Sequence, residues 1–264
     1  MKLIITSLIL AGSLFSNSFS TRYDVNVGMF GNVGYADVTL NEDGNAYEIK
    51  LVATLIGTAA ALTDQRVETY VSKGNIVDGK YIPQSFIKIN KTSRGEKIQT
   101  YTFDHKNKEI KLLEDKNKWI SETKFDPIAV KLITKDVNVR SSKESTVKDF
   151  IDQDVLSSYL NTRKNCNVLH KEYNLLAIGA RNDNKDVSLS FLDGMSREGV
   201  ASNFSNDVEH LYKLNVQSIK KNEKNVDILI ALDNDGHIKE AVLGNVFWIG
   251  AINAKRVYHK VSLK

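Results

Sequence analysis

The sequence predicts a mainly β (α+β) fold, in which a curved antiparallel sheet, or half-barrel, wraps one main helix. Segments in which apolar and polar residues alternate recur along the chain, and turn-forming residues separate them about every ten residues. One stretch, residues 149–163, instead has the spacing of an amphipathic helix. A single open sheet of many strands must curl, and a helix inside the curl would cover its apolar face.

The expected strands share period-two alternation and end at residues that favour turns. They cover residues 23–27, 33–40, 47–51, 66–72, 84–91, 96–104, 109–114, 119–124, 175–179, 187–192, 210–219, 226–232, 237–243 and 247–262. The alanine-rich segment 55–62 is expected to form a helical turn or two. Residues 125–145 fit either strand or helix, and Asp193-Gly194 is expected to close a strand with a turn.

The predicted main helix has one face that repeats at three-and-four spacing. That face carries Leu156, Tyr159, Leu160 and Arg163. Asp152 or Asp154 can cap the start of the helix, and a cation such as Arg163 is favourable near its end. We expect this face to point into the sheet.

The N-terminus has the order of a secretory signal peptide. Lys2 precedes an apolar run over residues 3–15 and a small polar stretch over 16–20. Ser18 and Ser20 would occupy the small-residue positions before a cut, so the mature chain is expected to start near Thr21. The apolar run is shorter than the roughly 17–25 residues that span a bilayer, and an uncleaved anchor is the alternative. The sequence therefore predicts a signal peptide at 1–20, one β-rich domain at 21–264, and a periplasmic location.

Composition narrows the class of protein. The 264 residues include 36 basic and 32 acidic side chains, a balance that argues against a nucleic-acid partner. Cys166 is the single cysteine, so an exported form has no internal disulfide, which fits a periplasm-like space. Cys166 follows Arg163-Lys164, which would lower a thiol pKa, but a small residue near a helix end is the simpler interpretation. The lysine clusters at 106–108 and 220–224 are read as solvated loops, with contact to anionic head groups or peptidoglycan as the alternative.

No metal site or cofactor site is expected. The five histidines are isolated in sequence, and neither His-Glu-x-x-His nor Cys-x-x-Cys occurs. Asp233 and Asp235 resemble part of a calcium loop, but Ala231 and Val242 stand where an EF-hand needs its first ligand and its glutamate. Residues 233–236 are therefore interpreted as a hairpin turn, and residues 182–186 likewise as a polar turn.

No catalytic residue is predicted, and the chain is expected not to be an enzyme. There is no Gly-x-Ser-x-Gly elbow and no phosphate-binding loop. Gly28, Gly31 and Gly34 follow a strand but do not open a helix, which excludes a dinucleotide fingerprint. A hydrolase whose residues converge only in space stays as a third hypothesis.

A curved sheet closed by a helix readily leaves an apolar pocket with a few polar groups, which is the usual form of a small-ligand site. The residues expected to line it are Leu156, Tyr159, Leu160 and Arg163, with Tyr159 and Arg163 at its mouth. Core packing with a snorkelling arginine is the alternative for these two residues. A Leu160→Trp substitution is expected to fill the pocket.

Several motifs taken in order resemble the DUF3108 family of exported bacterial proteins of unknown function. They lie at residues 23–25, 31–36, 70–74, 101–104, 154–163, 191–194 and 232–238. The resemblance implies a periplasmic β-rich protein over most of residues 23–258, and no reaction. The implied half-barrel is also similar to that of lipoprotein carriers, a likeness of fold that does not fix function.

Two functional hypotheses follow. The first is a non-enzymatic periplasmic envelope protein that binds a lipid or other apolar ligand between sheet and helix, and does not span the membrane after signal cleavage. The alternative is a scaffold or assembly factor of a cell-envelope complex, acting through protein contacts. Its candidate surface is the apolar patch at residues 59–62.

Overall fold

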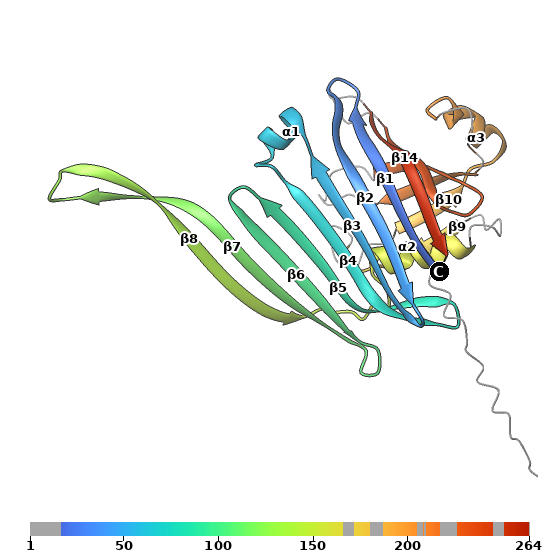
Figure 1. Ribbon diagram of the computed structural model, residues 1–264, viewed down its shortest axis with the longest axis horizontal. Coiled ribbons are helices and arrows are strands. Elements are labelled where there is room, and N and C mark those ends of the chain that lie inside the picture. Colours follow the sequence, from blue (N-terminus) through green and yellow to red (C-terminus); the bar gives the residue numbers. More distant parts are fainter. Residues whose placement is uncertain are drawn as a thin grey trace, which may run out of the picture.

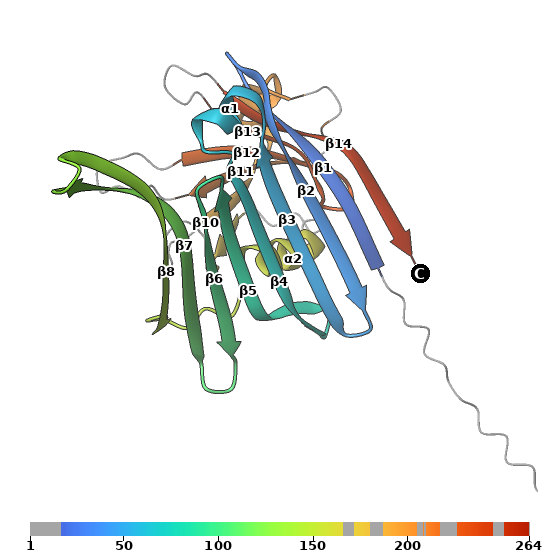
Figure 2. The same cartoon turned by 60° about the vertical axis from the view of Figure 1, so that its left-hand side comes forward.

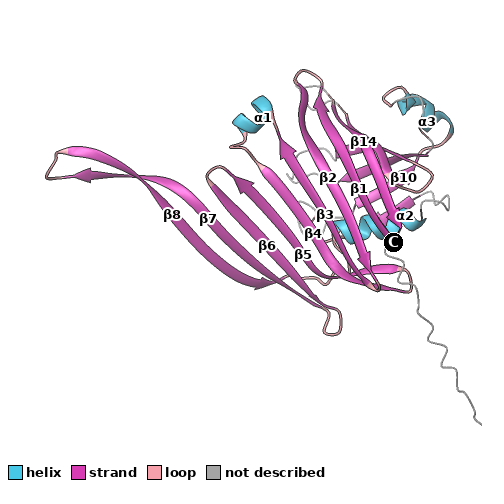
Figure 3. Ribbon diagram, in the orientation of Figure 1, coloured by secondary structure: helices cyan, strands magenta, loops and turns pink. Residues whose placement is uncertain are grey.

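The chain folds mostly into one antiparallel sheet, which confirms the mainly β prediction. The computed structural model describes residues 17–165, 172–179, 187–204, 208, 210–216, 226–244 and 251–263. These residues form a 14-stranded sheet in the order β8-β7-β6-β5-β4-β3-β2-β1-β14-β13-β12-β11-β10-β9 (Figures 1 and 3). Neighbouring strands pair antiparallel, and the outermost strands β8 and β9 do not pair with each other, so the sheet stays open.

The strands follow the alternation of the sequence, with turns between them. They are β1 (Asn17–Val27), β2 (Gly31–Asp43), β3 (Ala46–Leu55), β4 (Val67–Val77), β5 (Lys80–Thr92), β6 (Gly95–Asp104), β7 (Glu109–Asp126), β8 (Lys131–Thr146), β9 (Glu172–Leu175), β10 (Val187–Phe191), β11 (His210–Val216), β12 (Val226–Leu232), β13 (Ile238–Leu243) and β14 (Ile252–Leu263). The last strand, β14, pairs with the first strand, β1. This pairing joins the two halves of the sheet: the first half is β1–β8 and the second half is β9–β14.

The described residues contain three helices, α1 (Gly57–Leu62), α2 (Val155–Asn165) and α3 (Gly194–Ala201). None of them has both the length and the apolar composition needed to cross a membrane. Helix α2 packs against β3, β4 and β5. In Figure 2 it lies between these strands and the strands β10–β12 of the other half.

The largest core cluster fills the space between α2 and the first half of the sheet. Its buried members are Phe19, Tyr23, Val38, Leu40, Tyr47, Ile49, Tyr81, Phe86, Tyr101, Phe103, Ile110, Ile151, Leu156, Leu160 and Ile178. Most of them are alternate residues of β1–β7, as expected of a sheet with one dry face. Burial of these aromatic and aliphatic side chains is the main favourable contribution to folding.

The first strand begins earlier than the sequence analysis expected. Residues Asn17 to Ser20, placed in the signal peptide, pair with β14 on one side, and Ser18 to Ser20 also pair with β2 on the other. Phe19 is only 6% exposed and belongs to the core. Its ring lies 4.9 Å from that of His237, edge to face.

Other boundaries also differ from the prediction. The expected strands 109–114 and 119–124 are one strand, β7, and the ambiguous segment 125–145 contributes the long strand β8. Asp193 does not close a hairpin but begins α3, where its backbone N–H donates to Ser196 Oγ. Cys166, the 182–186 turn, the 220–224 cluster and most of 1–20 lie outside the described residues.

Helix α2 begins at Val155 rather than at residue 149, because Asp154 caps it. The Asp154 carboxylate accepts hydrogen bonds from the backbone N–H groups of Leu156 (2.8 Å) and Ser157 (3.1 Å). Its other oxygen accepts the hydroxyl of Ser72, on β4, at 2.6 Å. The carboxyl is fully buried, and burial raises its pKa above the ordinary value although these hydrogen bonds oppose the shift. One side chain therefore both starts the helix and fastens it to the sheet.

Replacing Asp154 should test this junction. Asp154→Ala is expected to lower the free energy of unfolding by about 3 kcal/mol, because Ser72 and two backbone N–H groups lose their acceptor. Asp154→Asn keeps one carbonyl oxygen for the two N–H groups and should cost less. Urea unfolding at neutral pH measures both losses, and equal losses would contradict the capping role.

The pH dependence of the free energy of unfolding gives a second test of the buried Asp154 carboxyl. Because the folded-state pKa of Asp154 is raised, ionisation favours the unfolded chain. The contribution of Asp154 to the free energy of unfolding should therefore fall as the pH rises from about 4 toward the raised pKa of this carboxyl. The difference in stability between the natural protein and Asp154→Asn should show this slope.

Candidate ligand-binding site

An apolar cavity of about 520 Å³ lies between α2 and both halves of the sheet. Its walls come from β1, β2, β3 and α2 on one side and from β10–β14 on the other. Small ligands are usually bound in cavities of this size with mainly apolar walls. Because residues from the two ends of the chain line the same space, the curvature of the sheet creates the cavity.

The pleat of the strands determines which side chains form the cavity walls. Val38, Ile49 and Leu51 face the cavity from the first half, and Ile230 and Leu232 face it from the second. Residues two apart on one strand point to the same side of a sheet, which explains the spacing. Four alanines also line the space, at positions 36, 177, 241 and 254, and their short side chains leave it unfilled.

Three of the four residues predicted to line a pocket do so, namely Leu156, Tyr159 and Arg163. Leu160 does not line it: its side chain is fully buried in the core cluster. On a helix, Leu160 is turned about 100° from Tyr159, which points it at the sheet rather than at the cavity. The expectation that Leu160→Trp fills the pocket is therefore wrong, and this substitution would overpack the core instead.

Ser158 is a lining residue that the sequence analysis missed. Its side chain is 4% exposed, and its Oγ has no hydrogen-bond partner among the described residues. A buried hydroxyl without a partner is costly, so a polar atom of a ligand would relieve the cost. The sequence holds no signal for this role, because the neighbouring Ser157 is also buried but bonds to Asp154.

Arg163 supplies a positive charge to the cavity wall. Its Nη1 lies 3.0 Å from Nε2 of His237, and its guanidinium carbon lies 5.2 Å from the ring centre of Phe19. Gly236 closes over the same arginine: it has φ +74°, and a Cβ there would lie 2.6 Å from the carbonyl oxygen of Arg163. The turn 233–236 is thus a packing surface for the end of α2, beyond its role as a hairpin turn.

Two tyrosines on the wall, Tyr23 and Tyr159, both interact with the backbone of Ile238. Tyr23 Oη donates to the carbonyl oxygen of Ile238 at 2.9 Å. Burial raises the pKa of Tyr23, and it raises the pKa of Tyr159 to about 12. Both side chains stay neutral phenols at neutral pH, so neither supplies a reactive phenolate.

Next to Arg163, two histidines and an ion pair form a compact polar cluster. The rings of His237 and His259 lie 4.4 Å apart, and Arg256 Nη1 lies 2.7 Å from Asp233 Oδ2. Burial and then the nearby Arg163 lower the pKa of His237 to about 3, and burial also lowers the pKa of His259. Both rings are therefore neutral at pH 7. Among the described residues, no group of three histidine, cysteine or acidic side chains converges on a metal position.

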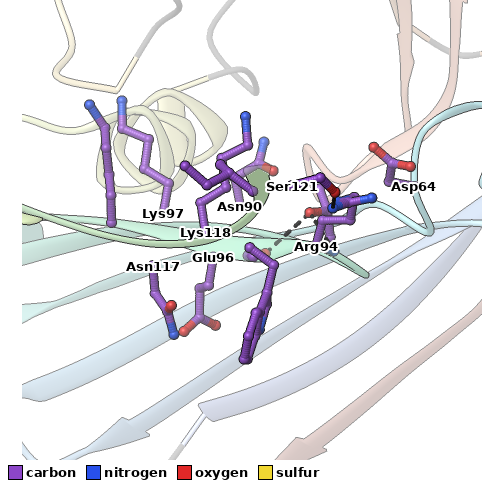
Figure 4. Close-up of a pocket in the computed structure, with 13 residues that line it drawn as sticks. Asp64, Asn90, Arg94, Glu96, Lys97, Asn117, Lys118 and Ser121 are labelled. Carbon is purple, nitrogen blue, oxygen red and sulfur yellow. Dashed lines mark hydrogen bonds between the residues drawn. The ribbon is translucent and has the colours of Figure 1, made fainter. Parts of the chain in front are cut away.

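A second hollow, of about 630 Å³, lies on the sheet surface where β5, β6 and β7 meet (Figure 4). Its polar and charged residues extend from both sides of the sheet: Lys97 and Lys118 point one way, and Glu96 and Asn117 the other. Arg94 donates to Ser121 at 3.3 Å. The polar groups do not converge on one point, so this surface lacks the geometry of an acid–base site.

No family model matches the chain, and no curated protein matches its sequence. Among solved structures, the chain is similar to the crystal structure of a beta-barrel-like protein of the domain of unknown function DUF1849 from Brucella abortus, with 10% sequence identity and a TM-score of 0.45. That similarity covers 94% of this chain and 98% of that chain. The resemblance to the DUF3108 family stays a prediction.

The polar cluster predicts a specific pH dependence. The pKa of His237 is lowered on folding, so its contribution to stability is complete above about pH 6.5 and is lost as the pH falls toward 3. His237→Gln should remove this part of the slope. Between about pH 6.5 and about pH 5 the natural protein should lose about 2 kcal/mol more than the variant. Urea unfolding at several pH values measures the difference, and parallel curves would contradict it.

Proposed function

We propose that this chain is a non-enzymatic binding protein of the cell envelope that holds an apolar ligand, such as the acyl chain of a lipid, in the cavity beside α2. In this proposal the curved sheet is a half-barrel and α2 is the one main helix that it wraps. The observation that carries the proposal is the apolar cavity of about 520 Å³ with a buried hydroxyl in its wall that has no hydrogen-bond partner in the described part of the chain.

The wall chemistry favours a ligand with one polar end. Valine, leucine, isoleucine and alanine side chains give the apolar contact that an acyl chain needs. Ser158 offers a hydroxyl that can donate or accept, and Arg163 adds a positive charge on the same helix. A carboxylate or phosphate ester at the end of an apolar chain would match both groups.

The export part of the proposal places the signal cut before Asn17. Ser16 is the small residue directly before that bond, and the third position before it holds Leu14. A cut before Thr21, as expected from the sequence alone, would remove Phe19 from the core and four residues from β1. The cut before Asn17 keeps the whole strand.

A scaffold role is the second candidate, and α1 is the feature that favours it. Leu62 is 80% exposed and Ile56 is 39% exposed at the two ends of this helix. These exposed apolar side chains are the candidate contact surface of the scaffold role. A scaffold of this kind needs no occupied cavity, which separates it from the ligand-binding role.

A substitution that narrows the cavity tests the proposal directly. Ala241 lines the cavity from β13, so Ala241→Phe should displace the bound chain and lower the fraction of ligand-bound protein at least about tenfold. Native mass spectrometry of gently purified protein, followed by denaturing extraction, measures this fraction. Ala201→Phe, at the exposed end of α3, is the matched control and should retain the ligand.

Either of two results would contradict the ligand-binding role. One is a ligand-free mass for the natural protein that persists after incubation with fatty acid or phospholipid. The other is equal ligand occupancy in the two phenylalanine variants. A ligand-free protein that co-elutes with another envelope protein, and loses it on Leu62→Asp, would favour the scaffold role.

The mass of the exported protein tests the position of the cut. We expect the protein recovered from the periplasm to begin at Asn17, because this start preserves the pairing of β1 with β2 and β14. Intact-mass measurement distinguishes this start from one at Thr21. A start at Thr21, in a protein as stable as a version that begins at Asn17, would contradict the structural role of Phe19.

A further inference from the structure

Strands β7 and β8 form a ribbon that projects beyond the rest of the sheet (Figure 1). Strand β6 pairs with β7 only as far as Lys118, which lies opposite Val139 of β8. The 16 residues of β8 therefore divide into two parts of equal length: residues 139–146 lie along the body of the sheet, and residues 131–138 belong to the projecting ribbon. Because the parts are equal, a two-fold axis at the middle of β8 would lay the projecting part of each copy along the body part of the other.

The outer edge of β8 is free along its length. Strand β8 pairs with β7 on one side, and no other strand of the described residues pairs with it. Such an edge presents a row of backbone N–H and C=O groups to any strand that lies beside it. Nearly every residue of β8 is exposed, including Val137 (37%) and Val139 (44%) at its middle. The edge can therefore accept a second strand, and the centre of the contact would be apolar.

The lysines of β8 do not oppose such pairing, because strand β7 supplies their counter-charges. Lysines on an edge strand commonly hinder the addition of another strand. Each lysine of β8 lies directly opposite a carboxylate of β7, in the pairs Lys131–Asp126, Lys135–Glu122 and Lys143–Glu114. The charges of residues 120–138 sum to zero. The ribbon therefore has no net charge that would repel a second ribbon.

Two other charges of β8 face neutral residues of β7. Asp136 lies opposite Ser121, and Arg140 lies opposite Asn117. Asp136 accepts a hydrogen bond from the Ser121 hydroxyl at 2.6 Å and lies 3.5 Å from Arg94, but its side chain is still 63% exposed. These two charges stand two residues before and two residues after Asn138. A two-fold axis at Asn138 would therefore set each of them opposite the other in a second copy.

The register centred on Asn138 places no like charges opposite each other. Its pairs across the two copies are Asn138–Asn138, Val137–Val139, Asp136–Arg140, Lys135–Ser141, Thr134–Ser142, Ile133–Lys143, Leu132–Glu144 and Lys131–Ser145. The register can shift only by even steps, because an odd step moves every side chain to the other face. A shift of two residues in either direction sets lysine opposite lysine. A shift of four sets either Asp136 or Arg140 opposite itself, so the charge pattern selects this one register.

We propose that two copies of this chain form a dimer by antiparallel pairing of their β8 edges in the register centred on Asn138. The two sheets join into one, and each ribbon lies along the body part of β8 in the other copy. The contact uses the same surface on both copies, so it closes at two. The interface lies outside the cavity, so the dimer forms whether or not the cavity carries a ligand.

The dimer also gives the apolar tip of the ribbon a contact. Phe125 and Leu132 are cross-strand partners that are 60% and 70% exposed, and Ile128 in the turn between them is 94% exposed. In the dimer register, this tip reaches the end of β8 in the other copy, beside its residues 147–150. Phe150 of that segment is half-buried and packs at the margin of the core. The exposed apolar cluster would thus meet an apolar side chain, as is common at contact surfaces.

Charge reversal tests the pairing with the chain that starts at Asn17. The natural protein should sediment as a dimer in analytical ultracentrifugation. Asp136→Arg and Arg140→Asp each set like charges opposite each other at two symmetric places, so each variant alone should dimerise at least about tenfold more weakly. An equimolar mixture of the two variants should regain the dimer, because each variant supplies the charge that the other lacks. Unchanged thermal unfolding of both variants confirms that they are folded.

Cysteine cross-linking tests the register. In a Cys166→Ser background, Asn138→Cys places two thiols directly opposite each other at the axis, within reach of a disulfide. Ser142→Cys is the matched control on the same strand and face. Residue 142 lies opposite Thr134 of the second copy, so the two thiols would be roughly 26 Å apart. Mild oxidation should cross-link the first variant into a covalent dimer and leave the second uncross-linked.

Three results would overturn the proposal. The first is a natural protein that stays monomeric up to the highest concentration at which it is soluble. The second is a mixture of Asp136→Arg and Arg140→Asp that dimerises no better than either variant alone. The third is cross-linking of Ser142→Cys as fast as that of Asn138→Cys, which would assign the dimer to another register or surface.

Discussion

The buried carboxylate of Asp154 fixes the position of α2, and most of the interior depends on where that helix lies. It accepts two N–H groups at the helix start and the hydroxyl of Ser72 on β4. The backbone on either side pairs with Ile178, through Val155 N–H at 3.0 Å and Gln153 C=O at 2.9 Å. With its first turn held on two sides, the helix has one direction and one rotation available.

That rotation divides the helix into two working faces. Leu156 and Leu160 join the aromatic core of the first half of the sheet. Leu156 also borders the cavity, together with Ser158, Tyr159 and Arg163, where small and aliphatic side chains do not fill the space. A helix placed to complete a core on one side thus leaves a cavity on the other, and the cavity is the feature that favours a ligand-binding role.

Pattern reasoning predicted the fold class and many of the strands, because period-two alternation reports directly which residues face a dry interior. It failed where that link is absent. Residues 125–145 are exposed over most of their length, so their alternation is weak and fits strand or helix equally. Asn17 to Ser20 have the small polar composition of a signal cut as well as that of a strand, and only their pairing with β2 and β14 distinguishes the two.

The candidate site was predicted in part for a similar reason. Helical spacing placed Leu156, Tyr159 and Arg163 on a common face, which they share. Spacing does not say which neighbour each side of that face meets, so Leu160 was assigned to the cavity although it packs in the core. The contact between Arg163 and His237 joins residues 74 apart in the chain. The cavity depends on which distant strands meet and on how far their side chains reach. Neither has a local signature in the sequence.

Methyl-group NMR during a titration with a long-chain fatty acid tests the central claim most directly. The cavity account predicts saturable shifts at the methyl groups of Leu156, Ile230 and Leu232, which line the space, with little change at exposed Leu62. Shifts confined to exposed methyl groups, or none at all up to the solubility limit of the fatty acid, would contradict it.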